Sequence, residues 1–197
     1  MPVFSMIFPR KPIDISGNLR VIPDGGEVPN LPDWRWIHVP GHSPGQVAFF
    51  RGEDGVLLAA DAFVTTRQES AMSIARQTPV MSGPPRYFTI DWDAAEESVR
   101  KLSDLEPEVV ATGHGRPLRG EYMREALRTL AENFQQFAVP RRGRYVDQPA
   151  LWDAEGIIYI PERDRRVDNV AFMFVGLAMV AGILTYVFSR QKKKKRR

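Results

Sequence analysis

Cysteine is absent from this 197-residue chain, and its absence excludes three kinds of chemistry. The protein can form no disulfide, no cysteine-ligated zinc site and no thiol nucleophile. Histidine is also scarce, because His38, His42 and His114 are the only three in the sequence. Any metal site or proton transfer that depends on imidazole must therefore use these three positions.

The body of the chain lacks an excess of positive charge. The formal net charge is +3, but seven of the 27 basic residues lie in residues 190–197. The remainder carries 20 basic and 24 acidic residues, a net charge of −4. A body with this balance offers no broad basic face, so we expect no nucleic-acid partner.

Residues 1–33 lack the basic stretch and the apolar core of about 7–15 residues that mark a secretory signal, so we expect a cytoplasmic body. One long apolar run lies near the other end. Residues 170–188 are 19 residues without a charge, about 28 Å long as a helix and enough to cross a bilayer. A buried core helix fits less well, because the run is apolar on every face and a basic block follows it. We expect a single-pass membrane anchor at residues 170–188, a basic tail at 189–197, and lipid as a partner.

The motif Pro40-Gly41-His42-Ser43-Pro44-Gly45 follows a predicted strand at residues 34–38, where apolar and polar side chains alternate. Pro40 ends that strand, since it fixes its own φ and holds the preceding residue extended. Gly41 and Gly45 allow backbone conformations that are closed to other residues. The pattern predicts a rigid loop that fixes the imidazole of His42 in space.

Two more apolar runs are each followed by a side chain that can bind a metal. Residues 56–60 lead into Asp61, and residues 109–111 lead into Thr112-Gly113-His114-Gly115. Sites in α/β sheets usually lie at such strand ends. Imidazole suits zinc or iron, and a carboxylate after a buried run needs a cation or a hydrogen-bonding cluster. The alternatives are a helix N-cap for Asp61 and two unligated loop histidines.

His38 lies within the first strand, four residues before His42. A histidine at such a place is more often packed, or supports a ligand, than a ligand itself, and we expect that supporting role for His38.

The remaining pattern predicts an α/β fold. Residues 46–51 and 56–60 flank Glu53-Asp54-Gly55 as a hairpin, and their apolar character predicts burial on both faces. Residues 62–90 are expected to be mostly loop with a short helix near 71–76. Asp91 can cap a helix, residues 108–111 form a strand, and a helix follows at about 121–137. The apolar positions expected to face the core from these helices are Trp92, Ala95, Val99 and Leu102, then Met123, Leu127, Leu130, Ala131 and Phe134.

Residues 139–169 change in character. Arg141, Arg142 and Arg144 make a basic stretch that proline and glycine interrupt, and residues 157–160 are a short strand candidate. We expect a basic linker with a small packed piece.

The order P-G-H-S-P-G, A-D-A-F and T-G-H-G resembles the C-terminal half of the metallo-β-lactamase superfamily, the glyoxalase-II-like hydrolases. The resemblance covers about residues 7–138 and implies that residues 1–138 form half of an αββα sandwich. It also implies that His42 binds one metal, Asp61 bridges two metals and His114 binds the other. Two divalent ions, with zinc as the expected metal, are the cofactors of the complete family site.

The family motif H-x-H-x-D-H is absent, since no histidine precedes His38. Each ion would therefore receive two ligands from this sequence, whereas a catalytic zinc normally has three and a water. We expect weak metal binding and little hydrolysis from these residues alone.

The resemblance implies a membrane-anchored, metal-dependent hydrolase of a small ester, thioester or lactone. The other half of its site would come from sequence upstream or from another polypeptide. The alternative is a non-catalytic, membrane-tethered scaffold or interaction protein derived from the same fold.

Overall fold

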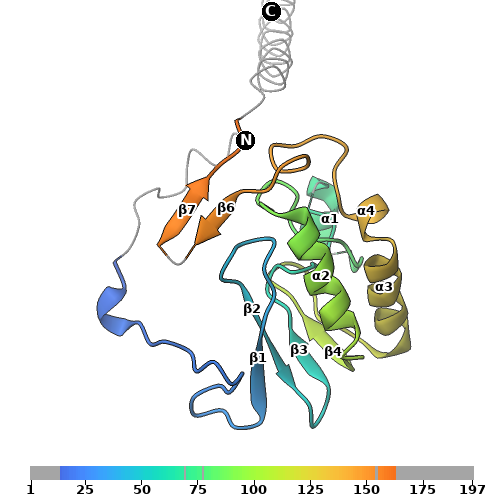
Figure 1. Ribbon diagram of the computed structural model, residues 1–197. Coiled ribbons are helices and arrows are strands. Elements are labelled where there is room, and N and C mark those ends of the chain that lie inside the picture. Colours follow the sequence, from blue (N-terminus) through green and yellow to red (C-terminus); the bar gives the residue numbers. More distant parts are fainter. Residues whose placement is uncertain (1–13, 69, 77, 154, 163–197) are drawn as a thin grey trace, which may run out of the picture.

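The computed structural model describes residues 14–68, 70–76, 78–153 and 155–162. It contains a five-stranded sheet in the order β1-β2-β3-β4-β5 (Figure 1). Strands β1 to β3 pair antiparallel, β3 pairs parallel with β4, and β4 pairs antiparallel with β5. The strands are β1 (Trp34–His38), β2 (Val47–Arg51), β3 (Val56–Leu58), β4 (Val109–Ala111) and β5 (Leu118–Arg119).

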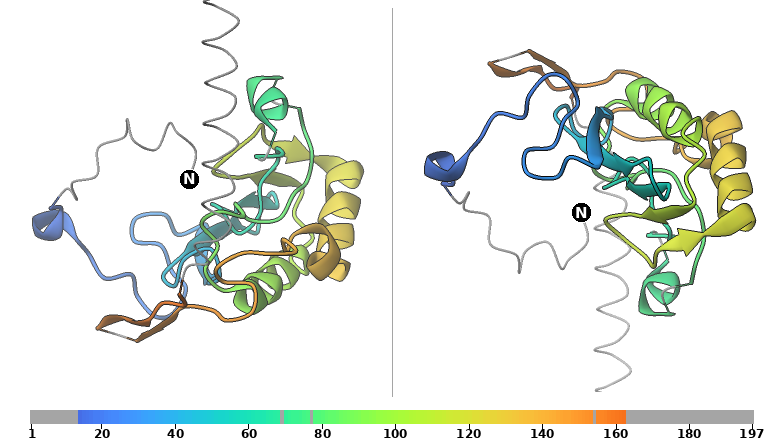
Figure 2. Two further views of the ribbon diagram at one scale, coloured as in Figure 1. Left: turned by 90° about the horizontal axis from the view of Figure 1, so that it is seen from above. Right: turned by 90° about the horizontal axis from the view of Figure 1, so that it is seen from below.

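Helices cover one face of this sheet. The two long helices, α2 and α3, lie side by side on it, and the views from above and below show the sheet and the helices as separate layers (Figure 2). Asp91 caps α2 as expected, because its Oδ1 accepts from the Ala94 amide at 3.0 Å. The helices are α1 (Ala71–Arg76), α2 (Trp92–Ser103), α3 (Gly120–Glu132) and α4 (Phe134–Phe137), with a short 3-10 helix, η2 (Ser16–Asn18), near the start.

The core fills the space between the sheet and these helices, and every apolar position predicted for α2 is buried in it. Strand period and register explain which sheet residues take part, since Phe50 and Leu57 pair directly and point to the helices. Core members from the sheet are Ala48, Phe50, Leu57 and Val110, and those from the helices include Trp92, Ala95, Val99, Leu102, Met123, Leu127, Leu130 and Phe134.

The prediction that the hairpin strands are buried on both faces is wrong. Trp36, Phe49 and Leu58 are aligned across β1, β2 and β3 on the face away from the helices. Trp36 and Phe49 are half-buried, and Leu58 is 39% exposed. Long apolar side chains mark both faces of these strands alike, so the sequence cannot tell a covered face from an open one.

The single helix predicted for residues 121–137 is also wrong in one respect. It consists of α3 and α4, separated at Asn133, which leaves the helical region with φ −119° and ψ 30°. The side-chain amide of Asn133 donates to the Thr129 carbonyl at 3.0 Å, a local bond that competes with helix continuation. Phe134 still reaches the core, where the centroid of its ring lies 6.3 Å from the centroid of the Trp92 ring.

The segment expected to be a basic linker contacts the domain over its first part. Val139, Tyr145 and Val146 pack against the core, and the Ala150 amide donates to the Ile90 carbonyl at 3.0 Å. A two-stranded sheet of β6 (Leu151–Asp153) and β7 (Gly156–Tyr159) follows. The strand predicted near residues 157–160 is therefore present, and β6 is its unpredicted partner.

The membrane anchor expected at residues 170–188 and the tail at 189–197 lie outside the described residues. Within the part of the chain that the structure describes, no helix has the length and apolar character needed to cross a bilayer.

Candidate functional site

The loop that carries His42 is fixed against the N-terminus of α2. Gly41 has a φ of +127°, and a Cβ there would lie 2.4 Å from the amide nitrogen of Ala95. Its carbonyl accepts from the amides of Ile90 and Asp91, both at 3.0 Å, and the Ser98 hydroxyl donates to the Pro40 carbonyl at 2.7 Å. Only glycine allows both this backbone conformation and this close approach.

Gly45, in contrast, has no positive φ, and a Cβ added there would meet no atom within 4 Å. Of the two glycines that allow unusual backbone conformations, only Gly41 uses that freedom. The shape of the loop depends on Gly41, because that residue alone of the two meets α2.

The ring of His42 is 16% exposed and has a neighbour at each nitrogen. Its Nδ1 lies 3.4 Å from the hydroxyl of Thr89, and its Nε2 lies 3.5 Å from Oδ2 of Asp61. Burial lowers the pKa of His42 below its ordinary value; the charge of Asp61 opposes that shift and the neighbouring His114 adds to it. The neutral imidazole, which is the form that binds metals, is favoured here.

Asp61 lies at the turn that follows β3. Ala60 before it has a φ of +48°, which is uncommon for a residue with a side chain, and its carbonyl accepts from the Gly113 amide at 2.8 Å. Oδ1 of Asp61 is buried and has no hydrogen-bond partner among the described residues. A Cβ on Gly113 would lie 2.3 Å from this oxygen. The N-cap role considered for Asp61 does not apply, since the next helix begins only at Ala71.

The loop that carries His114 is held through its backbone. The His114 carbonyl accepts from the Thr65 amide at 3.1 Å and from the Thr112 hydroxyl at 2.8 Å. The buried hydroxyl of Thr65 donates to the Arg116 carbonyl at 2.7 Å, and Gly115, with a φ of +102°, passes directly over it. The side chain of His114 is 52% exposed, and its Nε2 lies 3.6 Å from Oδ2 of Asp61.

The structure thus brings His42, Asp61 and His114 together at one edge of the sheet. Their N–O separations of 3.5 and 3.6 Å are longer than ordinary N–H···O hydrogen bonds of about 2.7–3.2 Å. Two ligands of one tetrahedral zinc ion, each about 2.1 Å from it, lie about 3.4 Å apart. The spacing therefore fits one metal ion between Oδ2 of Asp61 and His42, and another between the same oxygen and His114. Oδ1 of Asp61 has no hydrogen-bond partner among the described residues, which also fits a carboxylate that binds metal.

This edge does not hold a complete ligand set for one ion. Among the described residues, no group of three or more His, Asp and Glu side chains is placed to hold a metal ion. His42 and His114 each pair with Asp61.

His38 does not join the trio. Its ring is exposed, and Nε2 lies 2.7 Å from the Pro44 carbonyl, so the ring contacts the loop of His42 from outside. The sequence reasoning missed Thr65 and Thr89, two buried threonines that contact the histidine loops. Both lie in residues 62–90, where no periodicity or motif singles them out.

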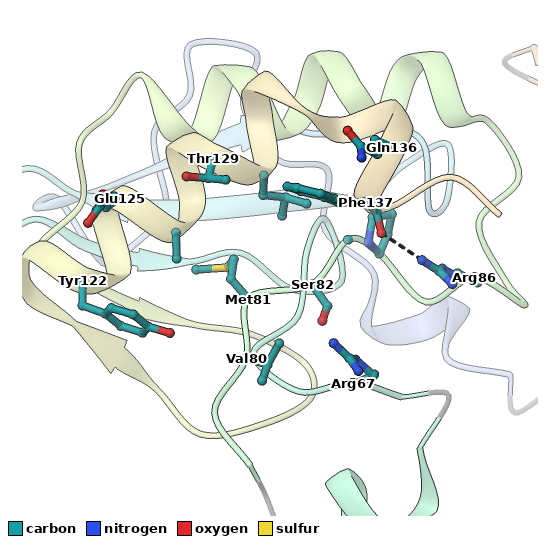
Figure 3. A pocket seen from close by; sticks show the side chains of 14 residues that line it. Arg67, Val80, Met81, Ser82, Arg86, Tyr122, Glu125, Thr129, Gln136 and Phe137 are labelled. Atoms are coloured by element: carbon teal, nitrogen blue, oxygen red, sulfur yellow. Dashed lines mark hydrogen bonds between the residues drawn. The ribbon is translucent and has the colours of Figure 1, made fainter.

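A cleft of about 760 Å³ lies elsewhere, between residues 80–86 and the outer sides of α3 and α4 (Figure 3). Arg86 lines it and donates to the carbonyls of Phe137 and Ala138 at 2.8 and 3.0 Å. None of the three clustered residues lines this cleft. It is therefore separate from the candidate site.

Comparison with known proteins identifies the superfamily of this chain. A family model described as the Metallo-beta-lactamase superfamily matches residues 2–114, which is more than half of the chain, so the chain belongs to this superfamily. The mixed α/β fold agrees with that assignment. The expected membership of the metallo-β-lactamase superfamily is confirmed.

One curated relative is similar over 127 residues. The chain is 46% identical over 127 residues to the probable metallo-hydrolase YflN of Bacillus subtilis (strain 168), a match that covers 64% of this chain and 48% of that protein. The chain thus spans about half the length of this curated relative.

Two solved structures are similar over about half of the chain. The metallo-beta-lactamase family protein TTHA1429 of Thermus thermophilus has 27% identity and a TM-score of 0.35, covering 52% of this chain and 30% of that one. TTHA1623, solved in a di-iron-bound form, has 28% identity and a TM-score of 0.37, covering 51% of this chain and 44% of that one.

Proposed function

We propose that this chain contributes one half of a two-metal hydrolase site, with His42 and His114 each binding one divalent ion and Asp61 bridging both. The observation that carries the proposal is the position of Asp61, whose Oδ2 lies 3.5 Å from Nε2 of His42 and 3.6 Å from Nε2 of His114. Zinc is the expected metal, because neutral imidazole and carboxylate are ordinary zinc ligands.

The residues have separate tasks in this site. Asp61 would supply negative charge to both positions, while the histidines would supply neutral donors and fix the separation between the ions. The chemistry that such a pair of ions supplies is activation of water and polarisation of the carbonyl of an ester, thioester or lactone. The substrate would be a small molecule of one of these classes.

The remaining ligands would come from polypeptide outside these 197 residues, since the sequence has no histidine before His38 and Asp61 is the one carboxylate paired with either site histidine among the described residues. The H-x-H-x-D-H motif of the family would supply them, either from upstream sequence or from a partner chain. Without them, we expect substoichiometric zinc that a chelator removes easily.

The experiment adds the missing ligands. The full chain is produced alone and together with a polypeptide that carries the H-x-H-x-D-H half of a related hydrolase. We then measure metal by elemental analysis and hydrolysis of ester, thioester and lactone substrates. Two ions per assembled pair and the appearance of hydrolysis are expected. Assembly of the two polypeptides without a gain in metal would contradict the proposal.

Membrane attachment is a separate part of the proposal. Residues 170–188 would form a single-pass anchor, with the body in the cytoplasm and the basic tail close to lipid headgroups. Deletion of residues 170–197 should release the protein from membranes. If the shortened chain still sediments with membranes after carbonate extraction, the anchor assignment is wrong.

A non-catalytic scaffold or interaction protein is the second candidate function. The observation that favours it is the absence, among the described residues, of any group of three or more side chains placed to hold one metal ion. A chain that assembles with the complementary half and yet binds no metal would support this alternative.

A further inference from the structure

We propose that Thr89 is a positioning residue that holds the ring of His42 as the tautomer with its proton on Nδ1, which leaves Nε2 free to face Asp61. The inference deepens the proposed function and rests on it where metal binding is concerned. It rests on two contacts of the same ring. The buried hydroxyl of Thr89 lies next to Nδ1, and the carboxylate of Asp61 lies next to Nε2.

The hydroxyl of Thr89 has only one proton, and the Pro85 carbonyl is the nearer of its two possible acceptors. Thr89 is 1% exposed, and its Oγ1 donates to the Pro85 carbonyl at 2.9 Å. The oxygen of the hydroxyl is then left as an acceptor. Nδ1 of His42 lies 3.4 Å away, so the hydrogen of this contact belongs to the ring.

A proton on Nδ1 also determines the state of Nε2. A neutral imidazole carries one proton, so a proton on Nδ1 leaves a lone pair on Nε2. That lone pair and Oδ2 of Asp61 are both acceptors, 3.5 Å apart, and a cation between them satisfies both. The other tautomer would donate from Nε2 to the carboxylate and occupy the position of the ion.

The two groups are held at this separation by backbone contacts. Immediately after Thr89, the amides of Ile90 and Asp91 both donate to the carbonyl of Gly41, the residue before His42, at 3.0 Å. At the other end of the turn, the amide of Thr89 donates to the Pro85 carbonyl at 3.1 Å. Thr89 and His42 therefore cannot separate unless these bonds break.

The tautomer can be measured without any metal. The full chain, labelled with ¹⁵N, is placed in detergent micelles, stripped with a chelator and kept at about pH 8 so that the imidazoles are neutral. Long-range ¹H–¹⁵N correlation spectra distinguish protonated from bare ring nitrogens. Only three histidines contribute, and single His→Gln variants assign them. We expect a protonated Nδ1 and a bare Nε2 for His42, and the opposite pattern in the wild-type chain would overturn the inference.

Variants then test whether Thr89 is the cause. Thr89→Val keeps the shape and removes the hydroxyl, so His42 should shift towards the Nε2–H tautomer, and Thr89→Ser should restore the wild-type pattern. Ser98→Ala is the matched control, since it removes another buried hydroxyl that bonds the same loop at Pro40 but does not touch the ring. If Thr89→Val leaves the tautomer unchanged, or Ser98→Ala shifts it equally, the inference is wrong.

Metal binding gives a second readout. Loss of a group that orients a metal-binding histidine typically weakens metal affinity by about 10–100-fold. We expect a loss of that size for Thr89→Val in the complemented protein, that is, the chain assembled with a polypeptide that carries the H-x-H-x-D-H half. Thr89→Ser should bind zinc nearly as the wild type does. If the wild-type protein binds no zinc, the proposed function fails, while the tautomer of the metal-free chain still tests the role of Thr89.

Discussion

The two histidine loops perform the same task by different means. Both present Nε2 of an imidazole to one oxygen of Asp61, at 3.5 Å from His42 and 3.6 Å from His114. The ring of His42 is 16% exposed and contacts a buried hydroxyl, whereas the ring of His114 is 52% exposed. In the second loop it is the His114 carbonyl, not the ring, that the threonine contacts.

The two loops thus differ in how the histidine side chain is held. The loop of His42 lies against a helix, so its ring can be oriented by a neighbouring side chain. The loop of His114 lies at the surface and is ordered by bonds to its backbone. A change in the environment of the ring should therefore affect His42, whereas a loss of backbone support can affect either loop. The predictions below test this comparison, beginning with the largest expected effect.

Asp61→Asn should remove the feature that the loops share. Both imidazoles face Oδ2, so an amide at this position loses the negative charge that offsets both ions. In the complemented protein we expect metal content to fall further than in Thr89→Val, which removes a group that only orients one histidine and should weaken metal affinity by about 10–100-fold. Elemental analysis measures this, and thermal unfolding of the metal-free protein serves as a control for the fold. Retention of both ions would refute the bridging role.

Gly41→Ala and Gly45→Ala form a matched pair within one loop. At Gly41 the new Cβ meets the Ala95 amide at 2.4 Å with φ at +127°, so we expect a destabilisation of about 2–4 kcal/mol. Gly45→Ala meets nothing within 4 Å and should change the free energy of unfolding by no more than about 0.5–1 kcal/mol. Denaturant titration compares the two. Equal effects would mean that contact with α2 does not determine the shape of this loop.

Thr65→Val should loosen the loop of His114 and leave the ring of His42 unchanged. It removes a buried hydroxyl that donates to the Arg116 carbonyl at 2.7 Å. Loss of a fully buried hydrogen bond costs about 1–3 kcal/mol, and this bond is partly buried, so the lower part of that range applies. We expect that loss of stability, together with faster amide hydrogen exchange at residues 112–116. A change in the ring-nitrogen signals of His42 would show instead that the two loops are not independent.

The metal-free protein should lose stability in mildly acidic solution because of His42. Burial keeps the folded-state pKa of this ring below its ordinary value of 6.5, so below pH 6.5 the unfolded chain takes up a proton that the folded chain does not. The free energy of unfolding should therefore fall as the pH drops through 6.5, until the folded-state pKa is reached. His42→Gln should remove this part of the pH dependence in denaturant titrations. An unchanged profile would mean that the ring is not buried as described.

His38→Ala should have the smallest effect. The ring of His38 is exposed and contacts only the Pro44 carbonyl in the described structure, at 2.7 Å. We expect a stability change of about 0.5 kcal/mol or less and unchanged metal content in the complemented protein. His42→Ala is the comparison, and equal metal loss from the two variants would contradict the assignment of ligands.

The elements that the sequence predicted well are those whose pattern is local. Strand β1 follows from a largely alternating pattern of apolar and polar residues, the N-terminus of α2 from Asp91, and the buried face of α2 from spacings of three and four. The break at Asn133 and the two-residue strand β5 were missed, because each depends on neighbours rather than on a periodic pattern.

The chemistry of the candidate site also came from the sequence. With no cysteine and only three histidines, a metal site had few possible ligands, and the three strand-end motifs indicated His42, Asp61 and His114. Spacing along the chain, however, contains nothing about distance in space. One oxygen of Asp61 faces both rings, and the other is buried with no hydrogen-bond partner among the described residues. This arrangement depends on the order of β1 to β4 in the sheet, which brings the ends of distant segments together.

The sequence by itself thus determined the residue types, the loops and the family, because these depend on motifs that short stretches carry. The tertiary structure decided which backbone positions tolerate no Cβ, which sheet face is open, and which threonine supports which histidine. Gly41 and Gly45 look alike in the sequence, as do Thr65, Thr66 and Thr89. They differ only in what the rest of the chain packs against them.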